Sequence, residues 1–200
     1  MNTTAIFAEL LVAGLLALVW LALVVLSFTR VTGSDAAAFA SQMKDWASLI
    51  SVFVLGFAYA LGIIVDRVAD SLFHRVDRGI RRRHLDKKLP SAAEMRLCVM
   101  ADADKLAGFL DYIRSRQRIT RSASLNLLLI SLASAVFLTR RSSAGILWVS
   151  STAIAALALA ALSLFAWERI SETYYKRLAQ SYTLLKEQDR HQSEGTQAHR

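Results

Sequence analysis

Residues 46–88 read WASLISVFVLGFAYALGIIVDRVADSLFHRVDRGIRRRHLDKK. The part from Trp46 to Val65 is an uncharged apolar run. Its length matches the roughly 20 residues that a helix needs to cross the hydrocarbon core of a bilayer, about 30 Å thick. Because no Pro interrupts the stretch, we expect one helix from Trp46 to about Gly79 that leaves the membrane near Asp66 and continues as a charged stalk.

Three further apolar runs have the same character, from Ile6 to Phe28, from Ser122 to Leu138 and from Gly145 to Trp167. Glu9 is the one ionisable residue in the four runs. A segment in lipid must satisfy its own backbone hydrogen bonds, and the chain has no alternating pattern typical of strands. The sequence therefore predicts an all-α protein, a four-span transmembrane helical bundle with a basic cytoplasmic helical extension.

The distribution of positive charge predicts how the chain is oriented. Of its 24 Lys and Arg residues, 14 lie between Arg67 and Arg121, whereas each of the other two connections between spans holds two. The positive-inside rule places the rich connection in the cytoplasm. Six more follow Trp167, and four spans return the chain to its starting side. We expect a multi-pass protein of the inner (plasma) membrane with both termini in the cytoplasm.

A cleaved signal peptide is the alternative interpretation of the first apolar run. Small residues from Ala36 to Ala40 would provide the cleavage region, and the order of charge, with no Lys or Arg before the run and Arg30 after it, opposes the expected orientation. The run is, however, longer than the 7 to 15 apolar residues of a signal peptide, and the charged segment that precedes such a run is missing. We expect it to be retained as a span.

Composition divides the chain into segments and excludes some kinds of site. Residues 1–66 form a first transmembrane hairpin, 67–121 a basic cytoplasmic helical hairpin, 122–167 a second transmembrane hairpin, 168–187 a cytoplasmic helix and 188–200 a polar tail that we expect to be disordered. One Pro and eight Gly are typical of a helical chain. The single Cys98 excludes an intrachain disulfide and leaves no pair of Cys for a zinc knuckle.

Charged residues recur every three or four positions on two helices that would run antiparallel through the membrane boundary. Acidic residues near the membrane would meet basic residues at equal depth, and ionisable groups at that depth usually face the protein interior and pair. The alternatives are charges solvated by lipid headgroups and a catalytic or metal-binding role. We call the predicted row of paired side chains the zipper. It consists of Asp66, Asp70 and His74 opposite Arg121, Arg118 and Arg114, respectively.

The spacing Gly62-x3-Asp66-x3-Asp70 resembles the end of the motif of CDP-alcohol phosphatidyltransferases. The resemblance implies carboxylates that hold divalent metals against a pyrophosphate substrate at the cytoplasmic membrane boundary. It covers nine residues. The acidic pair that opens the family's motif is missing here, where residues 51–54 read SVFV, and the family normally has six spans. We therefore do not assign the chain to this family.

Other catalytic patterns are missing from the sequence. It contains no H-E-x-x-H, no G-x-S-x-G, no phosphate-binding glycine loop and no Cys-His pair close in the chain. Of the four His residues, only His74 lies on the predicted polar face. We expect no catalytic residue, no cofactor and no bound metal, and we favour a non-enzymatic protein.

A polybasic segment follows the charged stalk. Anionic lipid headgroups would be attracted by about 1 kcal/mol per basic side chain, and an acidic protein partner suits the segment equally well. The alternative is a solvated turn that only sets the orientation of the chain. Nucleic acid is disfavoured because no aromatic residue lies between Phe73 and Phe109 to stack a base. The basic residues of this segment are Arg78, Arg81, Arg82, Arg83, Lys87 and Lys88.

A new helix is expected after Pro90, since Ser91 and Glu94 form the spacing of a capping box. Neither Pro nor Gly interrupts the chain between Gly108 and Gly145. We therefore expect one long helix that starts near Ser91 and contains the third span as its second half.

The fourth span and its extension carry two further patterns. Small residues four apart let helices approach closely, either within the bundle or between copies. Beyond Trp167 an apolar stripe must pack against something, either the helix that begins at Ser91, a second copy or a partner. The small residues are Ser151, Thr152, Ala155, Ala156 and Ala160, and the stripe consists of Ile170, Tyr174, Leu178, Tyr182 and Leu185.

These patterns favour a non-enzymatic, oligomeric membrane sensor, anchor or effector subunit coupled to a cytoplasmic partner. One alternative is a small pore built by several copies, which would need polar residues on a shared face deep in the bilayer. A metal-dependent enzyme acting on lipid headgroups is a further alternative. The candidates for a pore lining are Asn126, Ser131 and Ser134 on the third span with Ser51 and Tyr59 on the second.

Overall fold

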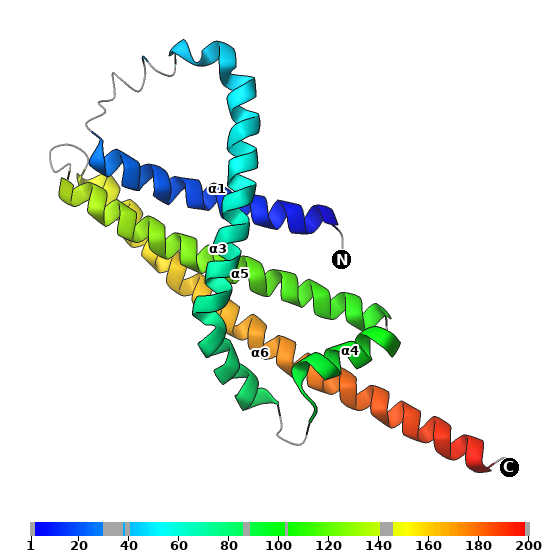
Figure 1. The fold of residues 1–200 in the computed structure, drawn as a ribbon. Helices are drawn as coiled ribbons and strands as arrows, with labels where there is room; N and C mark the ends of the chain where they lie inside the picture. Colours follow the sequence, from blue (N-terminus) through cyan, green and yellow to red (C-terminus); the bar gives the residue numbers. More distant parts are fainter. Residues whose placement is uncertain are drawn as a thin grey trace. The chain divides into compact units, whose positions relative to one another are not determined.

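The computed structural model describes residues 3–29, 38, 41–85, 89–102, 104–140 and 146–198. Within these residues the chain is helical and contains no strand, which confirms the all-α prediction. Four of the helices, α1, α3, α5 and α6, are long and apolar enough to cross a membrane, which indicates a multi-pass membrane protein. The α-helices are α1 (Thr3–Phe28), α3 (Ala47–His84), α4 (Ala92–Asp102), α5 (Asp104–Arg140) and α6 (Ile146–Ala198), and a short 3-10 helix, η1 (Lys44–Trp46), precedes α3 (Figure 1).

The chain divides into two compact units. We call Asn2–Leu72 with Ile119–Phe165 the apolar unit, and Phe73–Arg118 with Ala166–Arg200 the charged unit. Helices α3, α5 and α6 each contribute residues to both units without a break. The uninterrupted α3 and the continuation of α6 beyond Trp167 confirm two sequence predictions.

Apolar side chains cover the outside of the apolar unit. Val52, Phe53, Ile154 and Leu162 are 63% to 70% exposed. Keeping such surface in water costs about 25 cal/mol per Å². Lipid tails are as apolar as these side chains, so the same surface has no such cost in a bilayer. This outer surface is the one expected of spanning helices.

Within the apolar unit, α1 and α3 pack backbone against backbone. A Cβ atom at Gly14 would overlap the backbone oxygen of Ala58, and one at Gly62 would overlap the backbone oxygen of Leu10. Phe7 stacks on Tyr59 beside this crossing, with ring centroids 4.9 Å apart. Small residues allow such close approach in lipid, where packing rather than hydrophobic burial holds helices together.

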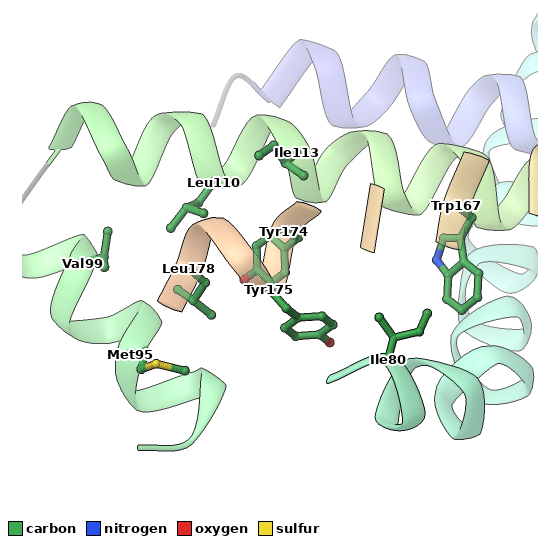
Figure 2. Close-up of a cluster of buried hydrophobic side chains, with 9 residues drawn as sticks. All are labelled: Ile80, Met95, Val99, Leu110, Ile113, Trp167, Tyr174, Tyr175 and Leu178. Carbon is green, nitrogen blue, oxygen red and sulfur yellow. The ribbon is translucent and has the colours of Figure 1, made fainter. Parts of the chain in front are cut away.

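The charged unit has a buried apolar core of its own. Side chains from four helices point toward one another in Figure 2, and α6 supplies the largest share. The core residues are Ile80 of α3, Met95 and Val99 of α4, Leu110 and Ile113 of α5, and Trp167, Tyr174, Tyr175 and Leu178 of α6.

The structure corrects the prediction of one long helix from Ser91 through the third span. Helix α4 ends at Asp102 and α5 begins at Asp104. In a straight helix Met95 and Ile113 would lie about 27 Å apart, at 1.5 Å per residue, yet both belong to the same core. The shared core therefore requires a change of direction between α4 and α5. The break allows α4 and α5 to bury their apolar faces together.

Polar contacts cap the start of α4 and join this helix to α5. The backbone N–H of Ser91 donates to Oε2 of Glu94 over 3.0 Å, and the N–H of Glu94 donates to Oγ of Ser91 over 3.3 Å, which confirms the capping box. Nη2 of Arg96 lies 2.8 Å from Oδ1 of Asp111 and ties α4 to α5.

At the C-terminal end the structure differs from the expected disorder. Helix α6 continues to Ala198, whereas the polar composition predicts a disordered tail from Gln188. Extending an existing helix adds one hydrogen bond per residue without the cost of nucleation, and residues 188–198 contain no Pro.

Candidate functional site

Helix α3 presents one polar face to its neighbours. Tyr59 and Gly62 lie against α1. Asp66 and Asp70 contact α5 within the apolar unit, and Asp77 contacts α5 and α6 within the charged unit. These five residues therefore join α3 to other helices.

An ion-pair cluster of Asp66, Asp70, Arg121 and Ser122 lies just past the apolar run of α3. Nη2 of Arg121 is 3.4 Å from Oδ1 of Asp66, and Nη1 of Arg121 donates a hydrogen bond to Oδ1 of Asp70. The hydroxyl of Ser122 is 3.4 Å from the same Oδ1 of Asp66. One guanidinium thus bridges two carboxylates that lie one helical turn apart.

Burial distinguishes the two carboxylates. The side chains of Asp66 and Arg121 are only 12% and 13% exposed, whereas that of Asp70 is 57% exposed. A charge removed from water needs a partner, so the contact between Asp66 and Arg121 matters more to the fold than the one that involves Asp70. A divalent metal at these carboxylates would have to compete with the guanidinium.

The remaining members of the predicted zipper lie elsewhere. His74 and Arg114 are exposed, and within the described chain neither forms a hydrogen bond or an ion pair. The pairing of Asp70 with Arg118 stays a prediction. Matching residues by depth predicted the pair of Asp66 with Arg121, which the structure contains, but not the second contact of Arg121 with Asp70.

The charged unit contains a second polar cluster that joins three helices. The hydroxyl of Tyr175 donates to Oδ2 of Asp77 over 2.7 Å. Nε2 of Gln117 lies 3.3 Å from Oδ1 of Asp77 and donates to Oγ of the buried Ser171 over 2.9 Å. Asp77 therefore accepts from both α5 and α6. The sequence alone did not predict this cluster. Gln117 follows Ile113 by four residues on the same face as Leu110 and Ile113, where a buried polar residue needs a hydrogen-bond partner.

Polar residues of the apolar unit form hydrogen bonds with other residues of the same chain. Nε1 of Trp20 donates to Oδ1 of Asn126 over 3.1 Å, and Nδ2 of Asn126 donates to the carbonyl of Ala13 over 2.9 Å. Asn126 and Ser134 are buried, and the hydroxyl of Ser131 donates to the carbonyl of Ala153 on α6. Of the other residues considered for a pore lining, Ser51 is exposed and Tyr59 stacks on Phe7.

The polybasic segment begins on the surface of the charged unit. Arg78, Arg81, Arg82 and Arg83 are exposed at the C-terminal end of α3, where positive charge also complements the helix dipole. Lys87 and Lys88 lie outside the described residues.

Helix α6 carries the small residues four apart and the apolar stripe, and the two patterns differ in burial. Ala156 and Ala160 are buried in the apolar unit, whereas Ser151, Thr152 and Ala155 are exposed. The stripe packs within the chain. Tyr174 and Leu178 belong to the core of the charged unit, and the stripe residues Ile170, Tyr182 and Leu185 pack against that core.

Among the residues that the structure describes, no three or more His, Cys, Asp or Glu residues form a group that could hold a metal ion. Comparisons of the chain with protein-family models, curated proteins and solved structures gave no match.

Proposed function

We propose that this chain is a multi-pass protein of the inner (plasma) membrane that acts, as an oligomer and without catalysis, as a sensor, anchor or effector subunit coupled to a cytoplasmic partner. The observation that carries the proposal is the uninterrupted course of α3, α5 and α6. Each helix combines an apolar part with a part that belongs to the separately packed charged unit.

Two features support a role in binding rather than in chemistry. The charged unit has a packed apolar core and polar contacts between its helices, as a rigid platform for a partner requires. Exposed arginines at the end of α3 provide charge for recognition. The excess of Lys and Arg between Arg67 and Arg121 supports a cytoplasmic location for this platform and for both termini.

A small pore built by several copies is the alternative. A pore between copies needs polar side chains on an outer face of the apolar unit. Of the candidates, Ser51 is exposed, whereas Asn126 and Ser134 are buried within one chain. The bonds of Asn126 to Trp20 and Ala13 give it a structural role between α1 and α5. These contacts favour the anchor over the pore.

An enzyme that acts on lipid headgroups through a metal at Asp66 and Asp70 is a third possibility. Arg121 contacts both carboxylates and supplies the positive charge that the metal would otherwise bring. Replacing Asp66 with Asn distinguishes a structural role, in the ion pair with Arg121, from a role as a metal ligand. We expect lower stability and a lower yield of the assembled protein, whereas lost function in an intact, abundant assembly would support the enzyme.

Oligomeric mass and ion flux, measured on one nanodisc-purified sample and the same protein in liposomes, test the proposal. We expect a discrete oligomer whose liposomes show no more ion flux than protein-free liposomes. A discrete oligomer that conducts ions would overturn the proposal in favour of the pore.

A further inference from the structure

Helix α3 presents an arginine face on the side away from the core of the charged unit. Arg75, Arg78 and Arg82 are exposed and follow one another at spacings of three and four, which places them on one side of the helix. The opposite side carries Asp77, which is bonded to α5 and α6, and Ile80, which belongs to the core.

Some arginines of the charged unit form ion pairs within the chain, whereas those of the arginine face do not. Arg96 pairs with Asp111, and Arg169 pairs with Glu172. By contrast, Arg75, Arg78 and Arg82 form neither an ion pair nor a hydrogen bond with any residue that the structure describes.

Like charges three or four positions apart destabilise a helix by about 0.2 to 0.5 kcal/mol per pair. The pairs Arg75 with Arg78 and Arg78 with Arg82 therefore oppose folding of α3 in the free protein. A surface of this kind becomes favourable when carboxylates are placed against it, because guanidinium groups bind carboxylates through two parallel hydrogen bonds.

We propose that the arginine face of α3, formed by Arg75, Arg78 and Arg82, docks an acidic helix of a partner protein. The three residues extend over about 10 Å of helix, at 1.5 Å per residue. Asp or Glu residues at the same spacings on a second helix would meet them in register. The inference rests on the proposed function, since it gives the cytoplasmic partner a binding surface and a charge.

An anionic membrane surface fits this face less well. Arg75 and Arg82 lie about 15 and 25 Å along α3 from Val65, where the apolar run ends. Surface charge is screened over about 8 Å at physiological ionic strength, and lipid headgroups form a flat layer. A row of charges that runs along the helix and away from the span therefore suits an elongated acidic partner.

The test uses the full chain in nanodiscs of phosphatidylcholine, so that no anionic lipid competes. The probe is a fluorescent Ala- and Gln-based helical peptide with Glu at spacings of three and four on one face. A peptide of the same composition with its Glu residues spread around the helix is the control. Fluorescence anisotropy measures binding, and we expect the one-faced peptide to bind about tenfold more tightly than the control.

Two variants with the same change of charge locate the surface on α3. Arg78→Glu changes the centre of the arginine face, whereas Arg83→Glu changes an exposed arginine outside this face on the same helix. We expect Arg78→Glu to weaken binding at least about tenfold, because it replaces attraction by repulsion, and Arg83→Glu to weaken it less than about threefold. Equal effects of the two variants, or equal binding of the two peptides, would overturn the proposal.

A lipid occupant would give a different result. If the one-faced peptide binds no better than the control, and Arg78→Glu weakens binding of phosphatidylglycerol vesicles more than Arg83→Glu does, the face binds lipid and the proposal of an acidic helix is overturned. None of these outcomes contradicts the proposed function. That function would be contradicted by ion flux in liposomes, a measurement that does not involve the arginine face.

Discussion

At the scale of single residues, Arg121 of α5 forms ion pairs with Asp66 and Asp70 of α3 and so joins the two helices in the apolar unit. We predict that Arg121→Ala lowers the free energy of unfolding by about 3 kcal/mol, because the buried carboxylate of Asp66 loses its guanidinium. Asp70→Ala should cost about 1 kcal/mol or less, since Asp70 is largely exposed. Thermal unfolding in nanodiscs measures both variants, and similar losses would contradict the ranking by burial.

Asp77 has the corresponding role in the charged unit, where it accepts hydrogen bonds from Tyr175 and Gln117. We predict that Tyr175→Phe destabilises the protein by about 1 to 2 kcal/mol, because it removes a short bond to a carboxylate without changing the ring. Tyr112→Phe makes the same change on a ring that is 52% exposed and should stay within about 0.5 kcal/mol of the parent. The unfolding midpoints of the two variants decide whether the hydroxyl of Tyr175 matters.

At the scale of elements, two glycines of α3 provide a matched pair. A Cβ at Gly62 would overlap the backbone of α1, whereas one at Gly56 would meet nothing within 4 Å. We predict that Gly62→Ala costs about 1 to 3 kcal/mol through overpacking. Gly56→Ala should be neutral or stabilising by up to about 1 kcal/mol, because Ala is the better helix former. Comparable unfolding temperatures for the two variants would show that α1 and α3 do not cross at Gly62.

Helix α6 allows the same comparison for the core of the charged unit. Leu178 is fully buried in that core, and Leu184 is 58% exposed. We predict a loss of about 2 to 5 kcal/mol for Leu178→Ala and of at most about 0.5 kcal/mol for Leu184→Ala. Folded-protein yield and thermal unfolding report the difference. A fully stable Leu178→Ala variant would mean that the stripe packs against a partner and not within the chain.

At the scale of the whole molecule, the sequence predicts what depends on local pattern. Apolar runs predict the four long helices, the Ser91 and Glu94 spacing predicts a helix start, and the Tyr174 and Leu178 periodicity predicts a buried face. Contacts between residues distant in sequence follow from packing and have no local signature. For this reason the Gly14 crossing and the Tyr175 bond to Asp77 were missed.

The break between α4 and α5 also follows from packing and has no local signature in the sequence. Both sides of the break are good helix formers, and the reason to separate them is the packing of Met95 and Ile113 in one core. The contact of Asp66 with Arg121 could be predicted because opposite charges repeat along two antiparallel helices. The second contact, of Arg121 with Asp70, depends on the reach of the Arg121 side chain and could not.

The central claim, a four-span membrane protein whose charged unit lies in the cytoplasm, is tested most directly by thiol labelling. Cys98→Ser removes the single Cys, and Gln42→Cys and Ala93→Cys then place one exposed thiol before α3 or on α4. In right-side-out membrane vesicles, a membrane-impermeant maleimide should label Gln42→Cys at once and Ala93→Cys only after the membrane is permeabilised. Labelling of Ala93→Cys in sealed vesicles, with Gln42→Cys protected, would contradict the orientation on which the account depends.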